Sequence, residues 1–406
     1  MNADESQATV ALERHEIRRL VRRPLGSLAQ GCRRVPGLTW IGLAAWNVFW
    51  AATNYRHMGG SWHYFRQGAR LLFHPGTSGG LRIYATHPWL QIGPLSFVAA
   101  APFSVGPVAV GRLAAVSVMT AAGLRAIAIA TATSHIRAGL ARRVRWAGLL
   151  FLPVWTELGT STGHLDDVLA VVLALLAVRA ASRARPVLTG LLLAGAVDAK
   201  PWAFGFVAVL LCLHSGQRIR AALAFAVGVG CAWLPFVFAD PHTLNAARFA
   251  IPNAAASALR ALGFHNASTP WWDRSAQILL GATIAAVVVR RSGAAAALVA
   301  VIAVRLILDP AVYSYYTSGL MAMTMAYDVI SRRRTFPWTT ASVLTFLYLP
   351  SIFVRSVPSA SSYSGDLRAA YLICLLGYLV VARIRAPSEP PAGPHHPPLD
   401  ALATAA

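Results

Sequence analysis

The sequence RPVLTGLLLAGAVDAKPWAFGFVAVLLCL (185–213) contains two apolar runs, each of about 12 residues, separated by the polar break DAKPW (198–202). Each run rises only about 18 Å as an α-helix, which is less than the ~30 Å hydrocarbon thickness of a bilayer. Arginines lie on both flanks, at Arg185 and Arg218, and basic flanks favour the cytoplasmic side of a membrane. Pro201 lacks a backbone N–H and interrupts a helix. The stretch therefore predicts a short helical hairpin whose turn lies in the outer half of the membrane.

The composition extends this interpretation to the whole chain. The 406 residues are 56% hydrophobic and 13% charged, with a mean hydropathy of +0.53, which is typical of an all-α, polytopic membrane protein. The net charge of +21 comes from arginines in short clusters between apolar runs, a distribution that sets membrane topology and argues against nucleic-acid binding. The first apolar run, 38–53, begins too late for a cleavable signal peptide, so we expect it to be the first transmembrane helix.

Apolar segments continue along the chain and predict about 11–13 hydrophobic helical segments. After the first, they cover 89–107, 110–131, 146–158, 165–178, 186–197, 202–213, 221–238, 276–289, 294–308, 312–330, 336–353 and 370–381. The arginine clusters in the second half of the chain fit one side, the cytoplasm, which makes both termini cytoplasmic. The basic segment 134–145 breaks this alternation. It fits only if 146–158 is re-entrant or if an earlier segment is broken.

The pattern divides the chain into three parts. Residues 1–37 are polar and basic and predict a cytoplasmic arm. Residues 38–385 form the multi-pass domain, which has two long external loops at 54–88 and 239–275. Residues 386–406 are rich in proline and alanine and predict a disordered cytoplasmic tail.

Lys200 is the only lysine among the 36 strongly basic residues, and it lies inside an apolar stretch. An ammonium group at membrane depth faces a cavity and has a partner. We expect Asp198 to be its counter-ion. Two interpretations remain open, a purely structural Asp198–Lys200 pair or a site for a lipid phosphate in which Arg66 and Arg70 assist.

The motif GHLDD (163–167) places two adjacent carboxylates, Asp166 and Asp167, before an apolar segment. Neighbouring residues point to different faces of a helix, so we expect at most one of them to face a site. There it would bind sugar hydroxyls or a metal. The alternative is that the acids stabilise a helix N-terminus. His164 by itself does not define a metal site because no second histidine lies at ligand spacing, so no cofactor is assigned and a divalent metal stays open.

The first external loop, 54–88, combines cations with aromatic residues and contains no Asp or Glu. Its segment WHYFRQGARLL (62–72) has helical spacing, with Trp62, Phe65 and Ala69 on one apolar stripe. One interpretation is an amphipathic helix on the membrane surface, and the other is a lid that contacts the substrates. The candidates for phosphate binding are Arg66 and Arg70, those for proton transfer are His57 and His63, and those for substrate binding are Ser61, Trp62, Tyr64 and His87.

A second aromatic motif, DPAVYSYY (309–316), lies between two apolar runs. Its tyrosines form either an aromatic belt at the membrane interface or a sugar-binding edge, because a phenol offers both a stacking face and a hydroxyl. The substrate-binding candidates here are Asp309, Tyr313, Tyr315 and Tyr316. Arg305 lies four residues before Asp309 and is expected to pair with it.

The order of these motifs resembles the GT-C superfamily of integral membrane glycosyltransferases. HPWLQIGPL (87–95) follows the first loop, GHLDD opens a helix, the stretch ending in Lys200 and Pro201 comes next, and DPAVYSYYT appears late in the chain. The chain is most similar to the actinobacterial polyprenyl-phosphate-mannose-dependent mannosyltransferases of glycosyltransferase family 87, over roughly residues 38–330. Lys200–Pro201 is the sharpest element of the resemblance, which otherwise depends on the order of the motifs.

The resemblance implies transfer of a sugar, mannose in that family, from a polyprenyl-phosphate donor. The acceptor would be a membrane-associated glycolipid or polysaccharide of the cell envelope, and transfer would occur on the extracytoplasmic face of the plasma membrane, with inversion. A lipid-linked-sugar transporter or flippase is the alternative function. Polar loops and an intramembrane cation that face one side favour transfer over transport.

The resemblance also implies an acidic base for the acceptor hydroxyl, soon after the first helix. At that position this chain reads GGSWHYF (59–65), with Ser61 in place of an acid. Three interpretations follow. The base is His57 or His63, or it is Asp166 or Asp167 reaching in from the next external segment. In the third, the chain has lost catalysis and only binds a lipid-linked sugar.

Overall fold

The computed structural model describes residues 33–73, 76, 78–248, 250–356 and 361–382. The predicted basic arm 1–37 lies almost wholly outside these ranges, and the predicted tail 386–406 lies entirely outside them. Within the described residues the regular structure is helical and no strand is present, so the all-α prediction is confirmed for these ranges. The elements labelled η are 3₁₀-helical or π-helical segments.

The elements follow one another closely along the chain. In order they are α2 (Gly37–Thr53), η1 (Tyr55–His57), α3 (Trp62–Phe73), η2 (Gly80–Arg82), α4 (Ile83–Thr86), α5 (Pro94–Ser104), α6 (Val108–Thr133), α7 (Leu140–Thr156), η3 (Glu157–Thr162), α8 (Leu165–Ala181), α9 (Pro186–Ala199), η4 (Pro201–Cys212), α10 (Ser215–Ala239), η5 (Pro241–Arg248), α11 (Ala258–Ala261), α12 (Asp273–Leu308), α13 (Ser314–Ser331), α14 (Trp338–Val343), η6 (Leu344–Tyr348), α15 (Leu349–Ser356) and α16 (Ser361–Val381). Each predicted apolar segment falls on one or more of these elements.

Among the described residues, four helices are long and apolar enough to cross a membrane. They are α6, α10, α12 and the stretch Tyr363–Val381 of α16. Of these, α12 consists of two helices joined at Gly293, whose backbone is not helical (φ 82°, ψ 175°). The outer surface agrees with this, because Leu223, Val227 and Phe238 of α10 are 61%, 61% and 80% exposed. A row of exposed apolar side chains on one helix is expected where the surroundings are lipid. These findings support a membrane protein, whereas the number of crossings and the orientation of the termini stay predictions.

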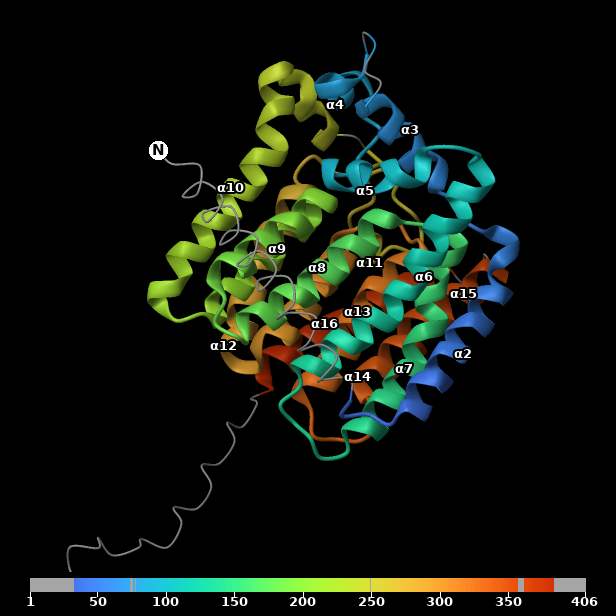
Figure 1. Ribbon diagram of the computed structural model, residues 1–406, viewed down its shortest axis with the longest axis vertical. Helices are drawn as coiled ribbons and strands as arrows, with labels where there is room; N and C mark the ends of the chain where they lie inside the picture. Colours follow the sequence, from blue (N-terminus) through green and yellow to red (C-terminus); the bar gives the residue numbers. More distant parts are fainter. Residues whose placement is uncertain (1–32, 74–75, 77, 249, 357–360, 383–406) are drawn as a thin grey trace, which may run out of the picture.

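The helices run back and forth between two ends of the bundle (Figure 1). One end, called here the loop end, carries the first loop (54–88) and the start of α8. The other, called the arginine end, carries the start of α2 and the end of α16. There Arg34 donates to the carbonyl oxygen of Ser134 at 3.2 Å, and Arg291 donates to that of Val380 at 3.1 Å. Of the predicted arginine clusters, the pair 290–291 therefore lies at this end, beside the end of α16.

The structure settles the position of the basic segment 134–145. The predicted crossing 89–107 contains only the 11-residue helix α5, which lies across the loop end in Figure 1. The N–H of Gly93, before α5, donates to the carbonyl oxygen of Ala199 at 3.1 Å, which fixes that end of α5 beside the turn after α9. Consequently α6 descends to the arginine end and α7 returns, so 134–145 lies beside Arg34. The earlier segment 89–107 is therefore interrupted, and 146–158 lies on α7, which runs from the arginine end towards the loop end.

The predicted helical hairpin is present as α9 and η4, which pack against each other. Lys200 separates them in an extended conformation, with φ −149° and ψ 109°. The second arm is a 3₁₀-helix of 12 residues, and a 3₁₀-helix rises about 2.0 Å per residue, so this arm spans about 24 Å instead of the 18 Å of an α-helix. The hairpin packs between α8, α10 and α12 and holds Lys200 at the loop end.

A smaller apolar cluster fixes the first loop to the bundle. Tyr84 of α4 packs against Phe97 of α5 and against Trp233 and Phe236 of α10, with ring centroids 5.1–6.2 Å apart. These rings are buried except for that of Trp233, which is partly buried. Burying an aromatic side chain contributes roughly 1.5–3 kcal/mol, so the loop is held as a packed cover over the loop end.

Candidate functional site

The first loop (54–88) lies directly against the segment that precedes GHLDD. The N–H groups of residues 59, 60 and 61 donate to the carbonyl oxygens of residues 160, 161 and 162 at 2.8, 3.0 and 2.7 Å. Gly59 and Gly163 both have left-handed backbones, with φ +65° and φ +67°. A Cβ on Gly163 would lie 2.9 Å from the Cα of Gly59. The approach of these two segments therefore requires glycine at position 163.

Gly163→Ala is expected to destabilise the protein, because a left-handed alanine costs about 1–2 kcal/mol and its methyl group would press on Gly59. The measurement is the thermal unfolding midpoint of the purified protein in detergent. Gly42→Ala is the matched control, since a Cβ at this helical position of α2 meets nothing within 4 Å. Equal midpoints for the two variants would show that the approach of the segments tolerates a side chain.

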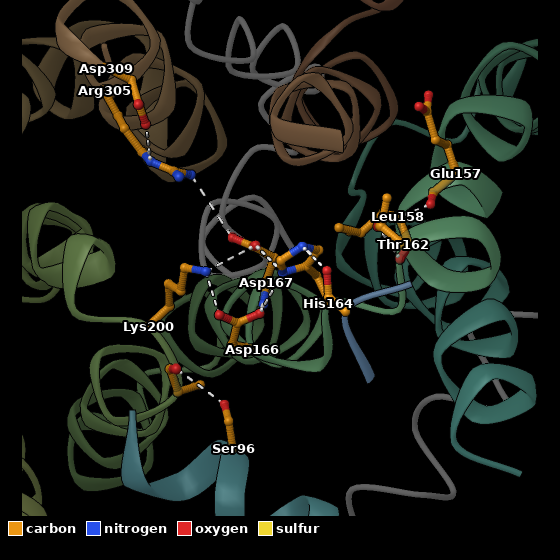
Figure 2. A network of polar contacts seen from close by, with 12 residues as sticks. Ser96, Glu157, Leu158, Thr162, His164, Asp166, Asp167, Lys200, Arg305 and Asp309 are labelled. Carbon is orange, nitrogen blue, oxygen red and sulfur yellow. Dashed lines mark hydrogen bonds and ion pairs between the residues drawn. The ribbon is translucent and has the colours of Figure 1, made fainter. Parts of the chain in front are cut away.

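Lys200 contacts two carboxylates at the start of α8 (Figure 2). Its Nζ donates to Oδ2 of Asp166 and, at 3.2 Å, to Oδ2 of Asp167. The predicted pairing with Asp198 is wrong. Asp198 still belongs to α9, where its Oδ1 is buried without a hydrogen-bond partner within the described residues, whereas Lys200 has left the helix and reaches α8. The counter-ions of the lysine are therefore 33 and 34 residues distant in the sequence.

Both carboxylates of GHLDD take part, and the expectation that at most one would face the site is wrong. They lie in the first turn of α8, where Oδ1 of Asp166 accepts the N–H of Asp167 at 2.9 Å. The remaining oxygen of Asp166 and the side chain of Asp167 are then both within reach of one ammonium group. Asp166 and Asp167 are buried, so each depends on these contacts in place of water.

Arg305, in the last turn of α12, adds a second cation to this arrangement (Figure 2). Its guanidinium lies 3.5 Å from Asp309 and 3.9 Å from Asp167, so the predicted Arg305–Asp309 pair is confirmed. The guanidinium carbon is 4.5 Å from the ring centroids of both Trp202 and Tyr316. Such stacking fixes a planar cation more firmly than a charge contact alone.

His164 connects this arrangement to the first loop. Its Nε2 lies 2.9 Å from Oγ of Ser61, and its Nδ1 lies 3.5 Å from Oδ1 of Asp166 and 3.9 Å from Oδ2 of Asp167. Its ring stacks on Tyr315, with centroids 4.0 Å apart. We call His164, Asp166, Asp167, Lys200, Arg305 and Asp309 the charged cluster. His164 was not among the catalytic residues predicted from the sequence, although its place just before two acids at a helix start was the available signal.

Ser61, His164 and Asp166 contact one another in that order, and this arrangement indicates which reaction they could support. A hydroxyl, an imidazole and a carboxylate in line resemble the relay of acyl-transfer enzymes, which also need free N–H groups as an oxyanion hole. Around Ser61 these groups are already used, because the N–H groups of 59–61 donate to 160–162 and that of Trp62 donates to Gly59. The arrangement therefore suits removal of a proton from a bound hydroxyl.

The charged cluster also contains groups that bind metals. One ligand atom each from His164, Asp166 and Asp167 lie within 4.8 Å of one another. Imidazole and carboxylate are common ligands of divalent ions. Here, however, the ammonium of Lys200 contacts Oδ2 of both acids and supplies the positive charge that such an ion would bring. The geometry therefore fits a lysine-paired cluster better than a resident metal.

Arg66 and Arg70 lie apart from Lys200, in a pocket of about 400 Å³ between α3 and the start of α6. We call it the arginine pocket, and its lining includes Trp62, His63, Arg66, Arg70, Val108 and Arg112. The predicted helix over 62–72 is confirmed as α3, with Trp62, Phe65 and Ala69 on its buried face. Arg112 was missed because it lies in a segment that reads as an ordinary transmembrane helix.

Of the other candidates, some lie at the periphery and two contact the charged cluster. His57 is exposed in η1, Tyr64 is exposed beside His63, and His87 contacts Thr86 and Trp89. Within DPAVYSYY, Tyr315 and Tyr316 contact the charged cluster, while Tyr313 is 48% exposed and stacks on Tyr315. The three tyrosines thus form an aromatic edge that extends from the charged cluster to the surface.

A comparison of the chain with protein-family models, with curated proteins and with solved structures found no match. The function is therefore argued from the geometry of the site.

Proposed function

We propose that the protein is a GT-C-type membrane glycosyltransferase that moves a sugar, mannose by resemblance, from a polyprenyl-phosphate donor to a membrane-associated glycan or glycolipid acceptor. Three features support this proposal. The site lies at the loop end of an apolar helical bundle, it contains buried ionised groups, and an aromatic edge borders it. Aromatic rings next to hydroxyl-binding groups suit a sugar.

The observation that carries the proposal is the contact between His164 and Ser61. The contact places a base, His164, beside position 61, where the resemblance implies an acid and this chain has serine. In the proposed reaction, the acceptor hydroxyl replaces Ser61 as the partner of Nε2, and His164 takes its proton. Asp166 and Asp167 stabilise the resulting imidazolium, since both face Nδ1.

The proposed transfer is a single displacement. The acceptor oxygen forms a bond to the anomeric carbon while the bond from that carbon to the phosphate oxygen breaks, and the polyprenyl phosphate leaves with the electron pair. In this scheme Lys200 holds the two carboxylates ionised. The phosphate is assigned to first-loop cations such as Arg66 and Arg70, which stand apart from those carboxylates.

The test is a transfer assay with the purified protein in lipid nanodiscs, using radiolabelled mannosyl polyprenyl phosphate and an envelope lipid extract. The expected result is label in an acceptor glycan with release of polyprenyl phosphate, and no transfer from a nucleotide-linked mannose. A second experiment uses proteoliposomes without acceptor and follows the intact donor across the bilayer. Movement of the intact donor across the bilayer without transfer would identify a flippase, and donor binding with neither outcome would identify a binding protein.

A further inference from the structure

We infer that the arginine pocket binds the phosphate head of a membrane lipid, with Arg112 of α6 as its central ligand. The identity of that lipid as the sugar donor rests on the proposed function, whereas phosphate binding itself does not. The inference assigns the anion to α3 and α6 and leaves Lys200 to the carboxylates. Four properties of the pocket support it.

The first property is charge. Arg66 and Arg70 come from successive turns of α3, Arg112 comes from α6, and none of the lining residues is acidic. Three guanidinium groups beside one cavity repel each other unless an anion lies between them. Arginine is also the side chain that best matches the geometry of a phosphate group, because it offers paired N–H donors.

The second property is a set of unused donors. Nε1 of Trp62, Nε of Arg66 and Nε of Arg112 are all buried and have no hydrogen-bond partner within the described residues. Trp62 is only 1% exposed, so water does not reach its ring freely. A buried donor without an acceptor is destabilising. A phosphate supplies several acceptor oxygens and would satisfy these groups together.

The third property is the end of a long helix. Val108, which lines the pocket, is the first residue of α6, a helix of 26 residues. Its N-cap is Pro107, which makes no side-chain hydrogen bond to the helix. The N-terminus of a helix carries a partial positive charge and favours anions. This dipole adds to the charge of the three arginines.

The fourth property distinguishes a lipid from a soluble phosphate. Val108 and Leu71 line the cavity, and Val108 is 49% exposed. Val105 and Val110, its close neighbours in the sequence, are 81% and 63% exposed. A cavity of about 400 Å³ holds a phosphate head, and an apolar rim offers a path for a hydrocarbon chain. A soluble phosphate has no hydrocarbon chain to place against that rim.

The pocket also shares a wall with the charged cluster. Gly59 and Gly60 line it, and the next residue, Ser61, contacts His164. A Cβ on Gly59 would lie 3.1 Å from Cγ of Arg112, so the arginine packs closely on this wall. A phosphate held by Arg112 would therefore lie beside the residues assigned to proton transfer, as a donor for that reaction requires.

The experiment measures binding of radiolabelled undecaprenyl phosphate, without sugar, to the protein in nanodiscs. Arg112→Gln is expected to weaken binding by about 10- to 100-fold, the loss of a charge-assisted hydrogen bond of about 1.5–3 kcal/mol. Arg56→Gln, which alters an exposed arginine of the same loop outside the pocket, is the matched control and should bind as the wild type does. If Arg112→Gln does not fold, Arg70→Gln replaces it, because Arg70 is exposed.

Competitors identify the ligand. Unlabelled undecaprenyl phosphate should displace the label, whereas undecaprenol and millimolar inorganic phosphate should not. Equal displacement by undecaprenol would overturn the phosphate site, and displacement by low inorganic phosphate would overturn the lipid assignment. Unchanged binding by both pocket variants would also overturn the inference, even if transfer occurs. A further outcome is that the wild type binds lipid phosphate, that Arg112→Gln loses this binding, and that the wild type transfers no sugar. The inference would then stand and the proposed function would be rejected.

Discussion

Lys200→Met is expected to destabilise the protein by about 3–5 kcal/mol, the usual effect of removing one partner from a buried ion pair. Without the ammonium, the carboxylates of Asp166 and Asp167 face each other in a buried site where Arg305, at 3.9 Å, is the nearest remaining cation. Their mutual repulsion opposes folding of the α8 start against the hairpin. The measurement is the thermal unfolding midpoint in detergent, and sugar transfer should fall with it.

A compensated variant separates charge balance from other effects. Lys200→Met combined with Asp166→Asn and Asp167→Asn removes the cation and both anions, so the midpoint should recover in large part while transfer stays lost. A wild-type midpoint for Lys200→Met alone would contradict the structural role. If that variant also failed to bind polyprenyl phosphate, Lys200 itself would be the phosphate ligand, which is one of the two interpretations that the sequence leaves open.

His164→Gln is expected to lower the transfer rate by about 10²- to 10⁴-fold, the range attributed to a lost general base. Glutamine keeps a polar contact with Ser61 but takes up no proton. Because the substitution removes neither Lys200 nor a carboxylate, the unfolding midpoint and the affinity for polyprenyl phosphate should stay close to those of the wild type. Steady-state transfer and lipid binding are measured on the same preparation.

The other loop histidines provide the controls. His57 is exposed in η1 and His87 contacts Thr86 and Trp89, so His57→Gln and His87→Gln should retain the wild-type rate. The opposite outcome, full activity in His164→Gln and loss in His57→Gln, would show that the base lies in the first loop. Loss in none of the three would leave His63, Asp166 and Asp167 as the remaining candidates for the base.

Local contacts were the ones that could be predicted from the sequence. The hairpin followed from two short apolar runs around Pro201, and the Arg305–Asp309 pair followed from helical spacing. The partner of Lys200 was assigned by nearness in the sequence, which selected Asp198. The true partners lie on α8, and only the packing of α8 against α9 brings them within reach.

The short helix α5 shows why an apolar run in the sequence can be mistaken for a membrane crossing. The stretch 89–107 is apolar enough to read as a crossing, but part of its apolar surface packs on the first loop. A Cβ on Gly68 of α3 would lie 2.0 Å from the ring of Phe97. Hydropathy records that a side chain avoids water and does not record whether lipid or protein covers it. Arg112 was missed for the same reason, since its neighbour across the pocket is a loop.

The pairing of residues 59–61 with 160–162 has a consequence for how this site can evolve. The bonds join main-chain groups only, so the register of the two segments does not depend on the side chain at position 61. Serine, or an acid such as the resemblance implies there, can occupy that position without moving the backbone. The side chain that faces His164 is thus interchangeable, and the chemistry of the site can change by one substitution on a fixed frame.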